Sequence, residues 1–385
     1  MIRTSRADGK ALVGKAQDHK DLRARLLSWY NRSARILPWR ISPADRRQGR
    51  RPDPYKVWLS EIMLQQTTVG AVGPYYRSFL QRWPDVMALA TATEDEVLHA
   101  WQGLGYYARA RNLRACAQEI AQRQGIWPTD ETNLLALPGI GPYTAAAIAA
   151  IAFDRKVVPV DGNVERVMAR IFAITTPLPK AKPELRRLAQ SFALGKSPGD
   201  FAQALMDLGA TVCTPRQPKC AACPLTRTCQ GYAKNIADEL PRRAARAAKP
   251  TKYGYVFWLT TSEGRIFLRR RAPKGLLGGL MEFPSTAWGT NFLDPKAARA
   301  QAPLPMASLS QWVLLPGTIR HIFTHFTLEL RVITARLNQS PRDGLWVDPA
   351  SFHELALPSL MKKITTHVLS NSEKTLCNQP KLSKN

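Results

Sequence analysis

The sequence predicts an α-helical domain followed by a smaller α+β domain. In residues 21–232 apolar residues recur at spacings of three and four, as in DVMALATATEDEVLHAW and NVERVMARIFAI, which is typical of helices packed on a core. Beyond residue 252 the pattern changes to alternation, which is typical of strands. The length of 385 residues leaves ample chain for separate cores.

The domains follow one another in a simple order. Residues 1–20 are expected to form a flexible tail before the helical domain at 21–232. Residues 233–252 contain LPRRAARAAKPTK, with five basic residues and no acidic one, and are interpreted as a linker. The α+β domain at 253–370 begins with KYGYVFWLTTSEGRIFLRRR, continues with the alternating IRHIFTHFTLELRVITARL and ends in a helix near LPSLMKKITTHVL. Residues 371–385 are expected to be a disordered tail.

The charge of the chain indicates a polyanionic partner. Lys and Arg number 55 against 29 Asp and Glu, giving a net charge of +26. The basic residues are spread along the chain without a clean amphipathic helix, which favours nucleic acid over a membrane surface. The apolar runs fall short of the ~20 residues of a membrane span, and the N-terminus lacks an apolar signal region. We therefore expect an intracellular, cytoplasmic and nucleoid-associated monomer that does not bind membranes.

Four of the six cysteines lie in one short segment, CTPRQPKCAACPLTRTC, with the spacing C-x6-C-x2-C-x5-C. Thiolates bind soft metals, and four of them suit either Zn²⁺ or a [4Fe–4S] cluster. Zinc ribbons usually contain two separated C-x2-C hooks, whereas this loop has one. Cys116 is expected in the core and Cys377 in the tail. The predicted metal ligands are Cys213, Cys220, Cys223 and Cys229.

The stretch LPGIGPYTAAAIAAI predicts a glycine turn followed by a helix with Pro in its first turn. Gly139 and Gly141 would leave backbone N–H groups open to an anion at the helix N-terminus. Gly-x-Gly also begins dinucleotide sites, but the preceding strand and the third glycine of that motif are missing here.

Two carboxylates are candidates for chemistry. On a helix through DPYKVWLSEIMLQQTTV, Glu61 shares its face with Trp58 and Leu64, and no basic residue lies at the neighbouring helical spacings. Burial without a partner raises the pKa of a carboxylic acid, so that it can act as a proton donor; a glutamate at a helix edge that reaches water is the alternative. Asp161 precedes a helix in VVPVDGNVERVMARI, where it serves as an N-cap, as a catalytic group, or as both.

Taken together, these motifs resemble the endonuclease III superfamily of DNA glycosylases. The cysteine spacing is similar to the iron–sulfur loop of that superfamily, and LLALPGIGPYTAAAI resembles its helix-hairpin-helix. SEIMLQQT, LPWR, GLGYYARARNL, VDGNVERV and FAQALMDLGATVCTP resemble segments of the adenine-specific MutY branch, in the same order. The resemblance implies a helix-hairpin-helix glycosylase domain with a [4Fe–4S] cluster in the loop at 213–229 and a duplex DNA substrate with adenine opposite 8-oxoguanine or G.

The resemblance also implies roles for single residues. Glu61 would protonate the adenine ring, and Asp161 would stabilise, or briefly bond to, the sugar carbocation. Tyr143 replaces the lysine by which bifunctional relatives form a Schiff base, and a phenol cannot form one, so hydrolysis would stop at an abasic site. Tyr143 and Asn163 would order the catalytic water and the carboxylates. Gln203 would contact the flipped adenine, and Gly139 and Gly141 would hold a phosphate. Gln66 and Tyr106 would wedge into the duplex, with Thr67, Leu37 and Arg40 nearby. The cluster loop would present basic side chains to DNA phosphates, namely Arg216, Lys219 and Arg227.

The C-terminal domain resembles a Nudix fold that has lost its hydrolase site. GRIFLRRRAPKGLLGGLMEFPS resembles the first strands, but the glutamates that would bind Mg²⁺ are missing from TAWGTNFLDPKAARAQAP. In MutY such a domain recognises 8-oxoguanine, and its Phe-Ser-His loop corresponds here to Phe323, Thr324 and His325, although IFTHF also suits an ordinary strand end. The family commonly has Gly-Leu-Trp in the strand before Glu-Phe-Pro. Leu277 and Leu280 occupy that region here, so we expect different packing there.

Two other functions suit parts of the sequence. A bifunctional pyrimidine-lesion glycosylase of the same fold is disfavoured by Tyr143 and by the Nudix-like domain. A nucleic-acid-binding protein whose cluster senses redox state would have no use for Glu61 and Asp161 as a pair of carboxylates.

Overall fold

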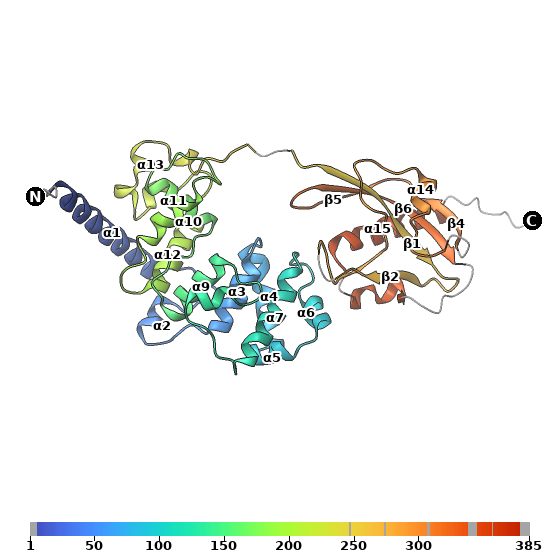
Figure 1. The fold of residues 1–385 in the computed structure, drawn as a ribbon, viewed down its shortest axis with the longest axis horizontal. Coiled ribbons are helices and arrows are strands. Elements are labelled where there is room, and N and C mark those ends of the chain that lie inside the picture. Colours follow the sequence, from blue (N-terminus) through green and yellow to red (C-terminus); the bar gives the residue numbers. More distant parts are fainter. Residues whose placement is uncertain are drawn as a thin grey trace, which may run out of the picture. The chain divides into compact units, whose positions relative to one another are not determined.

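The computed structural model describes residues 6–245, 248–272, 275–305, 309–337, 345–355 and 357–377, with side chains from residue 19 to residue 371 within these ranges. The chain divides into two compact units (Figure 1). The first comprises Met1–Ala92 and Asn112–Ala245, and the second comprises Thr93–Arg111 and Arg246–Asn385. Among the described residues, no helix is both long and apolar enough to cross a membrane.

The first unit is helical, as the sequence predicts. Its α-helices are α1 (Arg6–Ser33), α2 (Pro43–Arg47), α3 (Pro54–Leu64), α4 (Val69–Arg82), α5 (Val86–Thr91), α7 (Ala108–Gln122), α8 (Glu131–Leu135), α9 (Pro142–Phe153), α10 (Gly162–Ile171), α11 (Lys182–Gln190), α12 (Pro198–Thr211) and α13 (Gln230–Ala233), of which α7 begins within the second unit. Short 3-10 turns, η1 (Cys220–Ala222), η2 (Thr226–Thr228) and η3 (Ala237–Glu239), follow α12 and α13.

Helix α9 is the centre of this unit. Eight of its twelve residues are buried, which is expected of a helix covered on all sides. Helices α3, α8 and α12 pack against it, and α10 packs against α12. A Cβ on Gly209 would lie 2.6 Å from the Cβ of Asn163, so the glycine lets α12 approach the start of α10 closely. This packing brings the ends of α3, α9, α10 and α12 to one place.

The second unit is built on a mixed sheet, as the predicted α+β class requires. The sheet order is β3-β2-β1-β6-β4, with β5 paired to β6 and β7 paired to β2. Strands β1 and β6 run parallel and the other pairs run antiparallel. The elements are α6 (Glu94–Ala100), β1 (Thr251–Thr260), β2 (Ile266–Arg270), β3 (Met281–Glu282), α14 (Pro295–Arg299), β4 (Leu309–Leu314), β5 (Ile319–Ile322), β6 (Thr327–Leu337), β7 (Leu345–Val347), η5 (Pro349–Glu354) and α15 (Ser359–Cys377).

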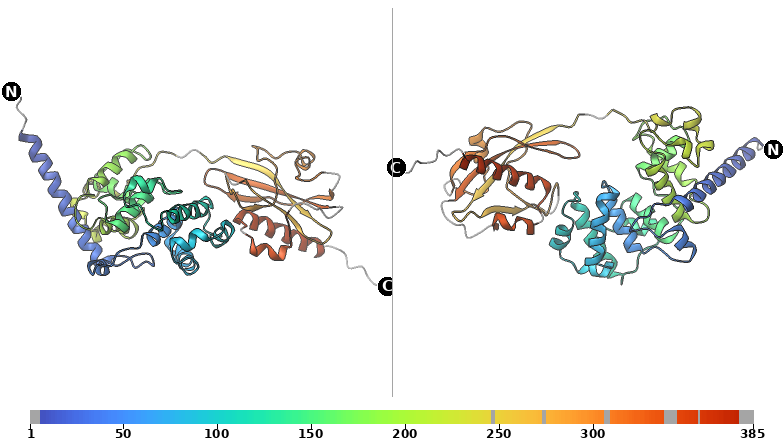
Figure 2. Two further views of the ribbon diagram at one scale, coloured as in Figure 1. Left: turned by 60° about the horizontal axis from the view of Figure 1, so that its bottom comes forward. Right: turned by 180° about the vertical axis from the view of Figure 1, so that it is seen from behind.

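Both faces of this sheet are covered, and the alternation along β1 shows how. Val256 and Trp258 belong to the apolar cluster that includes the buried side of α15. Tyr255 and Phe257 point the other way, into a second cluster that includes Ala298 of α14. Figure 2 shows α15 lying along one side of the sheet. The period of two read from the sequence therefore corresponds to two buried faces.

The structure differs from the sequence at the segment ends. Helix α1 begins at Arg6, within the predicted flexible tail. The two glycines of that segment weaken a helix only slightly, and no proline is present to interrupt it. The predicted linker is tied to the first unit over its first part, since the N–H of Leu178 donates to the carbonyl of Arg242 at 2.8 Å and that of Ala244 donates to Leu178 at 3.1 Å. Residues 1–5, 246–247 and 378–385 of the predicted tails and linker lie outside the described residues, whereas α15 continues to Cys377.

The second unit also contains Thr93–Arg111, which the sequence assigns to the helical domain. The side-chain amide of Gln102 donates to the carbonyl of Leu355 at 2.8 Å, and Arg270 forms an ion pair with Asp95 at 2.8 Å. Polar contacts of this kind leave no periodic signal in a sequence.

Candidate active site

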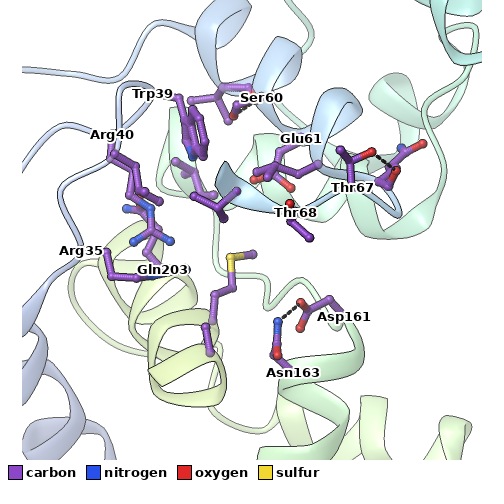
Figure 3. Close-up of a pocket in the computed structure, with 18 of the residues that line it drawn as sticks. Arg35, Trp39, Arg40, Ser60, Glu61, Thr67, Thr68, Asp161, Asn163 and Gln203 are labelled. Atoms are coloured by element: carbon purple, nitrogen blue, oxygen red, sulfur yellow. Dashed lines mark hydrogen bonds between the residues drawn. The ribbon is translucent and has the colours of Figure 1, made fainter. Parts of the chain in front are cut away.

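A cavity of about 590 Å³ opens where the helices of the first unit converge (Figure 3). Its lining comes from the loop before α2, from α3 and the turn after it, and from α9, α10 and α12. Its volume lies within the usual range for small-molecule sites. It gathers nine of the residues singled out in the sequence: Leu37, Arg40, Glu61, Gln66, Thr67, Tyr143, Asp161, Asn163 and Gln203.

Glu61 lies near the C-terminal end of α3 and is 6% exposed. Burial raises the pKa of this carboxyl to about 7, and the nearby charge of Asp161 adds to the increase. A hydrogen bond from Tyr143 and the positive charge of Arg40 act in the opposite direction. Because burial dominates, a substantial fraction of Glu61 is protonated at neutral pH.

Asp161 is the N-cap of α10. Its Oδ1 accepts the backbone N–H of Val164 at 2.8 Å, and its Oδ2 accepts the side-chain amide of Asn163 at 2.8 Å. Asn163 is itself held by Arg166, whose Nη2 donates to Asn163 Oδ1 at 2.9 Å. The cap and the catalytic candidate are therefore one residue, with its carboxylate fixed at the cavity wall (Figure 3).

Tyr143 follows the glycine turn between α8 and α9. Gly139 has a φ of 73°, and a Cβ there would lie 2.6 Å from the Asn112 side chain, so the turn requires glycine. A Cβ on Gly141, the N-cap of α9, would meet nothing within 4 Å. The protein itself does not require glycine at that position, whereas a ligand approaching the backbone would. Burial and the two nearby carboxylates raise the pKa of Tyr143, which therefore stays a neutral hydrogen-bond donor.

Sequence reasoning predicted Gln203 and Arg40 at this cavity but missed two charged residues beside them, Arg35 and Asp207. Gln203 is 2% exposed, and its side-chain amide donates to the carbonyl of Gly199 at 3.2 Å. Arg40 forms an ion pair with Asp207 at 2.7 Å, and Arg35 pairs with the same carboxylate at 2.5 Å. A single acidic residue in the apolar segment FAQALMDLG was the available signal for Asp207.

Two predicted wedge residues have unusual backbone conformations. Gln66, after α3 in the first unit, has a φ of 58°, and Tyr106, in the second unit, has a φ of 48°. Both side chains are exposed, and Tyr106 is 46% exposed. Left-handed conformations of residues other than glycine are strained and tend to occur at functional sites. Trp101, by contrast, is fully buried and belongs to the core.

The predicted lesion-reading residues form the turn of the β5–β6 hairpin. The N–H of Phe323 donates to the carbonyl of Phe326 at 2.9 Å and closes the turn, while Thr324 and His325 are exposed. The ring of Phe323 contacts those of His321 and Phe326. Within this second unit the hydroxyls of Thr324 and Tyr106 lie 2.8 Å apart, so two residues predicted from separate motifs are brought together.

Leu277 and Leu280, which stand where the family commonly has Gly-Leu-Trp, pack into the second unit. Leu277 has a φ of 55° and is partly buried against the cluster beneath α15, and Leu280 is 1% exposed. Both leucines therefore contribute to packing at this turn.

The four clustered cysteines line one small cavity of about 30 Å³. Arg170 donates to Cys213 Sγ at 3.3 Å, and the N–H of Leu225 donates to Cys223 Sγ at 3.4 Å. Burial raises the pKa of the Cys223 thiol to about 11. In the described part of the chain, no group of three or more Cys, His, Asp or Glu side chains is arranged around a single metal ion. Cys116 is fully buried elsewhere, as expected.

Comparison with known proteins places both units in described families. The family "HhH-GPD superfamily base excision DNA repair protein" matches residues 59–192, and "NUDIX domain" matches residues 255–367. The adenine DNA glycosylase of Mus musculus is 34% identical over 92% of this chain and 79% of its own length. That of Buchnera aphidicola (strain Bp) is 31% identical over 89% of this chain and 95% of its own. The structure of a thermostable thymine-DNA glycosylase, 29% identical, covers 57% of this chain and 99% of its own, with a TM-score of 0.50.

Proposed function

The chain belongs to the family of adenine DNA glycosylases, which remove adenine from DNA in base excision repair, and from that premise we propose how its residues perform the reaction. The substrate is duplex DNA with adenine opposite 8-oxoguanine or G. The enzyme hydrolyses the bond between adenine and its sugar and leaves an abasic site without cutting the strand.

The buried carboxyl of Glu61 is the observation that carries this proposal, because its pKa of about 7 keeps a proton available at neutral pH. Glu61 donates the proton to a ring nitrogen of adenine. The bond from the base to sugar C1′ then breaks, and its electron pair leaves with the neutral base. Glycoside hydrolases likewise use one carboxylic acid to protonate the leaving group and one carboxylate beside the sugar, the roles proposed here for Glu61 and Asp161.

Asp161 and its neighbours complete the reaction at the sugar. The Asp161 carboxylate stabilises the positive charge that develops on the sugar, and Asn163 and Tyr143 orient the carboxylates and the attacking water. Water adds to C1′ and gives its proton to the Glu61 carboxylate, which restores the acid and leaves a hydroxyl on the sugar. No lysine is among the described residues that line the cavity, and the Tyr143 phenol cannot form a Schiff base.

Other residues hold the duplex and the extruded base. Gln203, on the cavity floor, offers an amide that matches the hydrogen-bonding edge of adenine. The exposed side chain of Gln66, with Leu37, Arg40 and Thr67 in the same cavity lining, fills the space that the base leaves in the stack. The exposed Tyr106 of the second unit is proposed as a further wedge. The turn of Gly139 and Gly141 binds a backbone phosphate at the N-terminus of α9. Thr324, with Phe323 and His325, reads the oxidised base through its hydroxyl.

The loop at 213–229 is proposed to bind a [4Fe–4S] cluster through Cys213, Cys220, Cys223 and Cys229. The donor set fits, because all four cysteines line one cavity and N–H groups already point at two of the sulfurs. With its cysteines joined to a cluster the loop would be cross-linked, and the exposed Arg216, Lys219 and Arg227 would be kept in place for DNA phosphates.

Iron and sulfide analysis of the purified protein tests the cluster. Four irons per chain are expected, Cys223→Ser should lower that content, and Cys116→Ala should not. Zinc in place of iron would contradict the assignment.

The test of the function is a single-turnover assay on a duplex with labelled adenine opposite 8-oxoguanine, with products resolved before and after alkali. Strand cleavage only after alkali is the expected result. Cleavage without alkali would show lyase activity and contradict the role of Tyr143. No adenine release by the iron-loaded protein would contradict the proposed reaction.

A further inference from the structure

Asp207 lies on α12 and its side chain is 0% exposed, yet the reaction described above gives it no role. Its carboxylate holds two guanidinium groups. Oδ1 accepts from Arg35 Nε at 2.5 Å and from Arg40 Nη1 at 2.7 Å. Oδ2 accepts from the same Arg40 nitrogen at 2.8 Å and from the backbone N–H of Arg35 at 3.0 Å. One buried carboxylate therefore fixes two arginines that line the active-site cavity.

This arrangement affects Glu61 through charge. The Arg40 side chain is only 9% exposed, so water screens its charge poorly, and that charge lowers the pKa of Glu61. Asp207 supplies the compensating negative charge beside Arg40. Without it, a buried guanidinium in the cavity would favour loss of the Glu61 proton.

We infer that Asp207 is a positioning residue for the catalytic acid: it holds Arg40 against α12 and offsets its charge, so that Glu61 keeps its proton. The inference rests on the proposed role of Glu61. The charged and titratable groups that act on Glu61 are Tyr143 from α9, Asp161 before α10, and Arg40. Asp207 in turn faces Arg35, Arg40 and the buried phenol of Tyr30 on α1.

The test is the pH dependence of single-turnover adenine release by Asp207→Asn. Wild-type release should fall as pH rises through the Glu61 pKa of about 7. In Asp207→Asn the midpoint of this fall should lie about one pH unit lower, as an uncompensated neighbouring cation predicts. Arg40→Gln alone should move the midpoint upward. Asp207→Asn combined with Arg40→Gln removes both members of this charge pair and should move the midpoint back toward the wild-type value, with only the more exposed Arg35 left without its carboxylate. A role in packing alone would not produce this reversal.

Asp200→Asn is the matched control. Asp200 lies on the same helix and pairs with the buried Arg46 at 3.2 Å, but it does not line the cavity. This variant should lose stability and keep the wild-type midpoint.

A second readout separates failure of this inference from failure of the proposed reaction. NMR titration of labelled glutamate carboxyls, with Glu61→Gln used to assign the signal, reports the Glu61 proton in the free protein. If Asp207→Asn moves this titration but the wild type releases no adenine, the positioning role stands and the reaction is wrong. If adenine is released and neither the titration nor the midpoint moves, the positioning role is wrong. If Asp207→Asn does not fold, Arg40→Gln can be compared with the double variant Asp207→Asn, Arg40→Gln. Identical midpoints in these two proteins would show that the Asp207 charge does not act on Glu61 and would refute the inference.

Discussion

Glu61, the proposed catalytic acid, and Thr324, the proposed lesion-reading residue, lie in very different surroundings. Glu61 is 6% exposed, carries a hydrogen bond from Tyr143 and lies on a helix packed against the central helix of its unit. Thr324 is exposed at the turn between β5 and β6, and its hydroxyl lies 2.8 Å from that of Tyr106.

The difference follows from the tasks proposed for the two sites. A proton donor needs burial, because only removal from water raises the pKa of a carboxyl toward neutrality. A group that reads a base in a duplex must be accessible, and one hydrogen bond made there contributes only about 1 kcal/mol. We therefore expect large effects from changes at the buried site and small, substrate-dependent effects from changes at the exposed turn.

Glu61→Gln should have the largest effect. The amide keeps the shape of the side chain but is far too weak an acid to protonate the leaving base. Adenine release should fall by about 10⁴-fold, near the upper end of what a positioned acid contributes. Single-turnover kinetics measures the loss, and a gel-shift titration should show duplex binding close to wild type.

Glu119→Gln provides the control, because Glu119 lies on α7 with its side chain 45% exposed and does not line the cavity. Its rate should equal that of the wild type. Retained turnover in Glu61→Gln would remove Glu61 from the role of the acid.

Asp161→Asn separates the two tasks of that residue. Asn caps a helix about as well as Asp, so the free energy of unfolding should change by no more than about 0.5 kcal/mol. Loss of the charge that stabilises the sugar cation should slow adenine release by about 10²–10³-fold. Urea unfolding and single-turnover kinetics measure the two effects. A rate loss that only matched a loss of folded protein would leave Asp161 as a cap alone.

Much of the buried site was predictable because its residues lie in long, ordered motifs. The stretch around Glu61 and the turn of Gly139 and Gly141 carry both a helical pattern and special residues. Asp207 was missed because its partners, Arg35 and Arg40, lie more than 160 residues away in the chain. Long-range ion pairs of this kind leave no local periodicity.

The second unit was less predictable in its details. Alternation identified the strands, and the hydroxyl at Thr324 followed from the family loop, but the inclusion of Thr93–Arg111 depends on single polar contacts.

Backbone details in both units were also not predictable. The left-handed backbone of Gln66 and Tyr106 could not be foreseen, since neither is a glycine. Helix termini, such as the start of α1 at Arg6, depend on weak propensities that a sequence does not resolve.

The cost of burying Glu61 should be measurable as stability. The pKa of Glu61 is about 7 in the folded protein and 4.5 as its usual value. Below pH 4.5 the carboxyl is protonated in both the folded and the unfolded state, so its burial costs nothing. The free energy of unfolding then falls as pH rises through 7, because the buried carboxylate becomes charged. Glu61→Gln does not titrate and should be more stable than the wild type at neutral and higher pH. The full difference corresponds to about 3 kcal/mol. Urea unfolding at several pH values should show the advantage shrinking as the pH falls; a pH-independent difference would mean that Glu61 is not buried as an acid.

Thr324→Val should give the smallest effect, and one confined to substrate choice. Valine keeps the shape of threonine but removes the hydroxyl that lies beside Tyr106. Release of adenine opposite G should change little, while the preference for adenine opposite 8-oxoguanine should fall by about fivefold to tenfold, the value of one hydrogen bond. Thr318→Val, an exposed threonine next to the other end of β5, should leave the preference unchanged. Equal losses on both substrates would show that the turn supports binding in general, and the contrast between a buried chemical site and an exposed reading site would then be wrong.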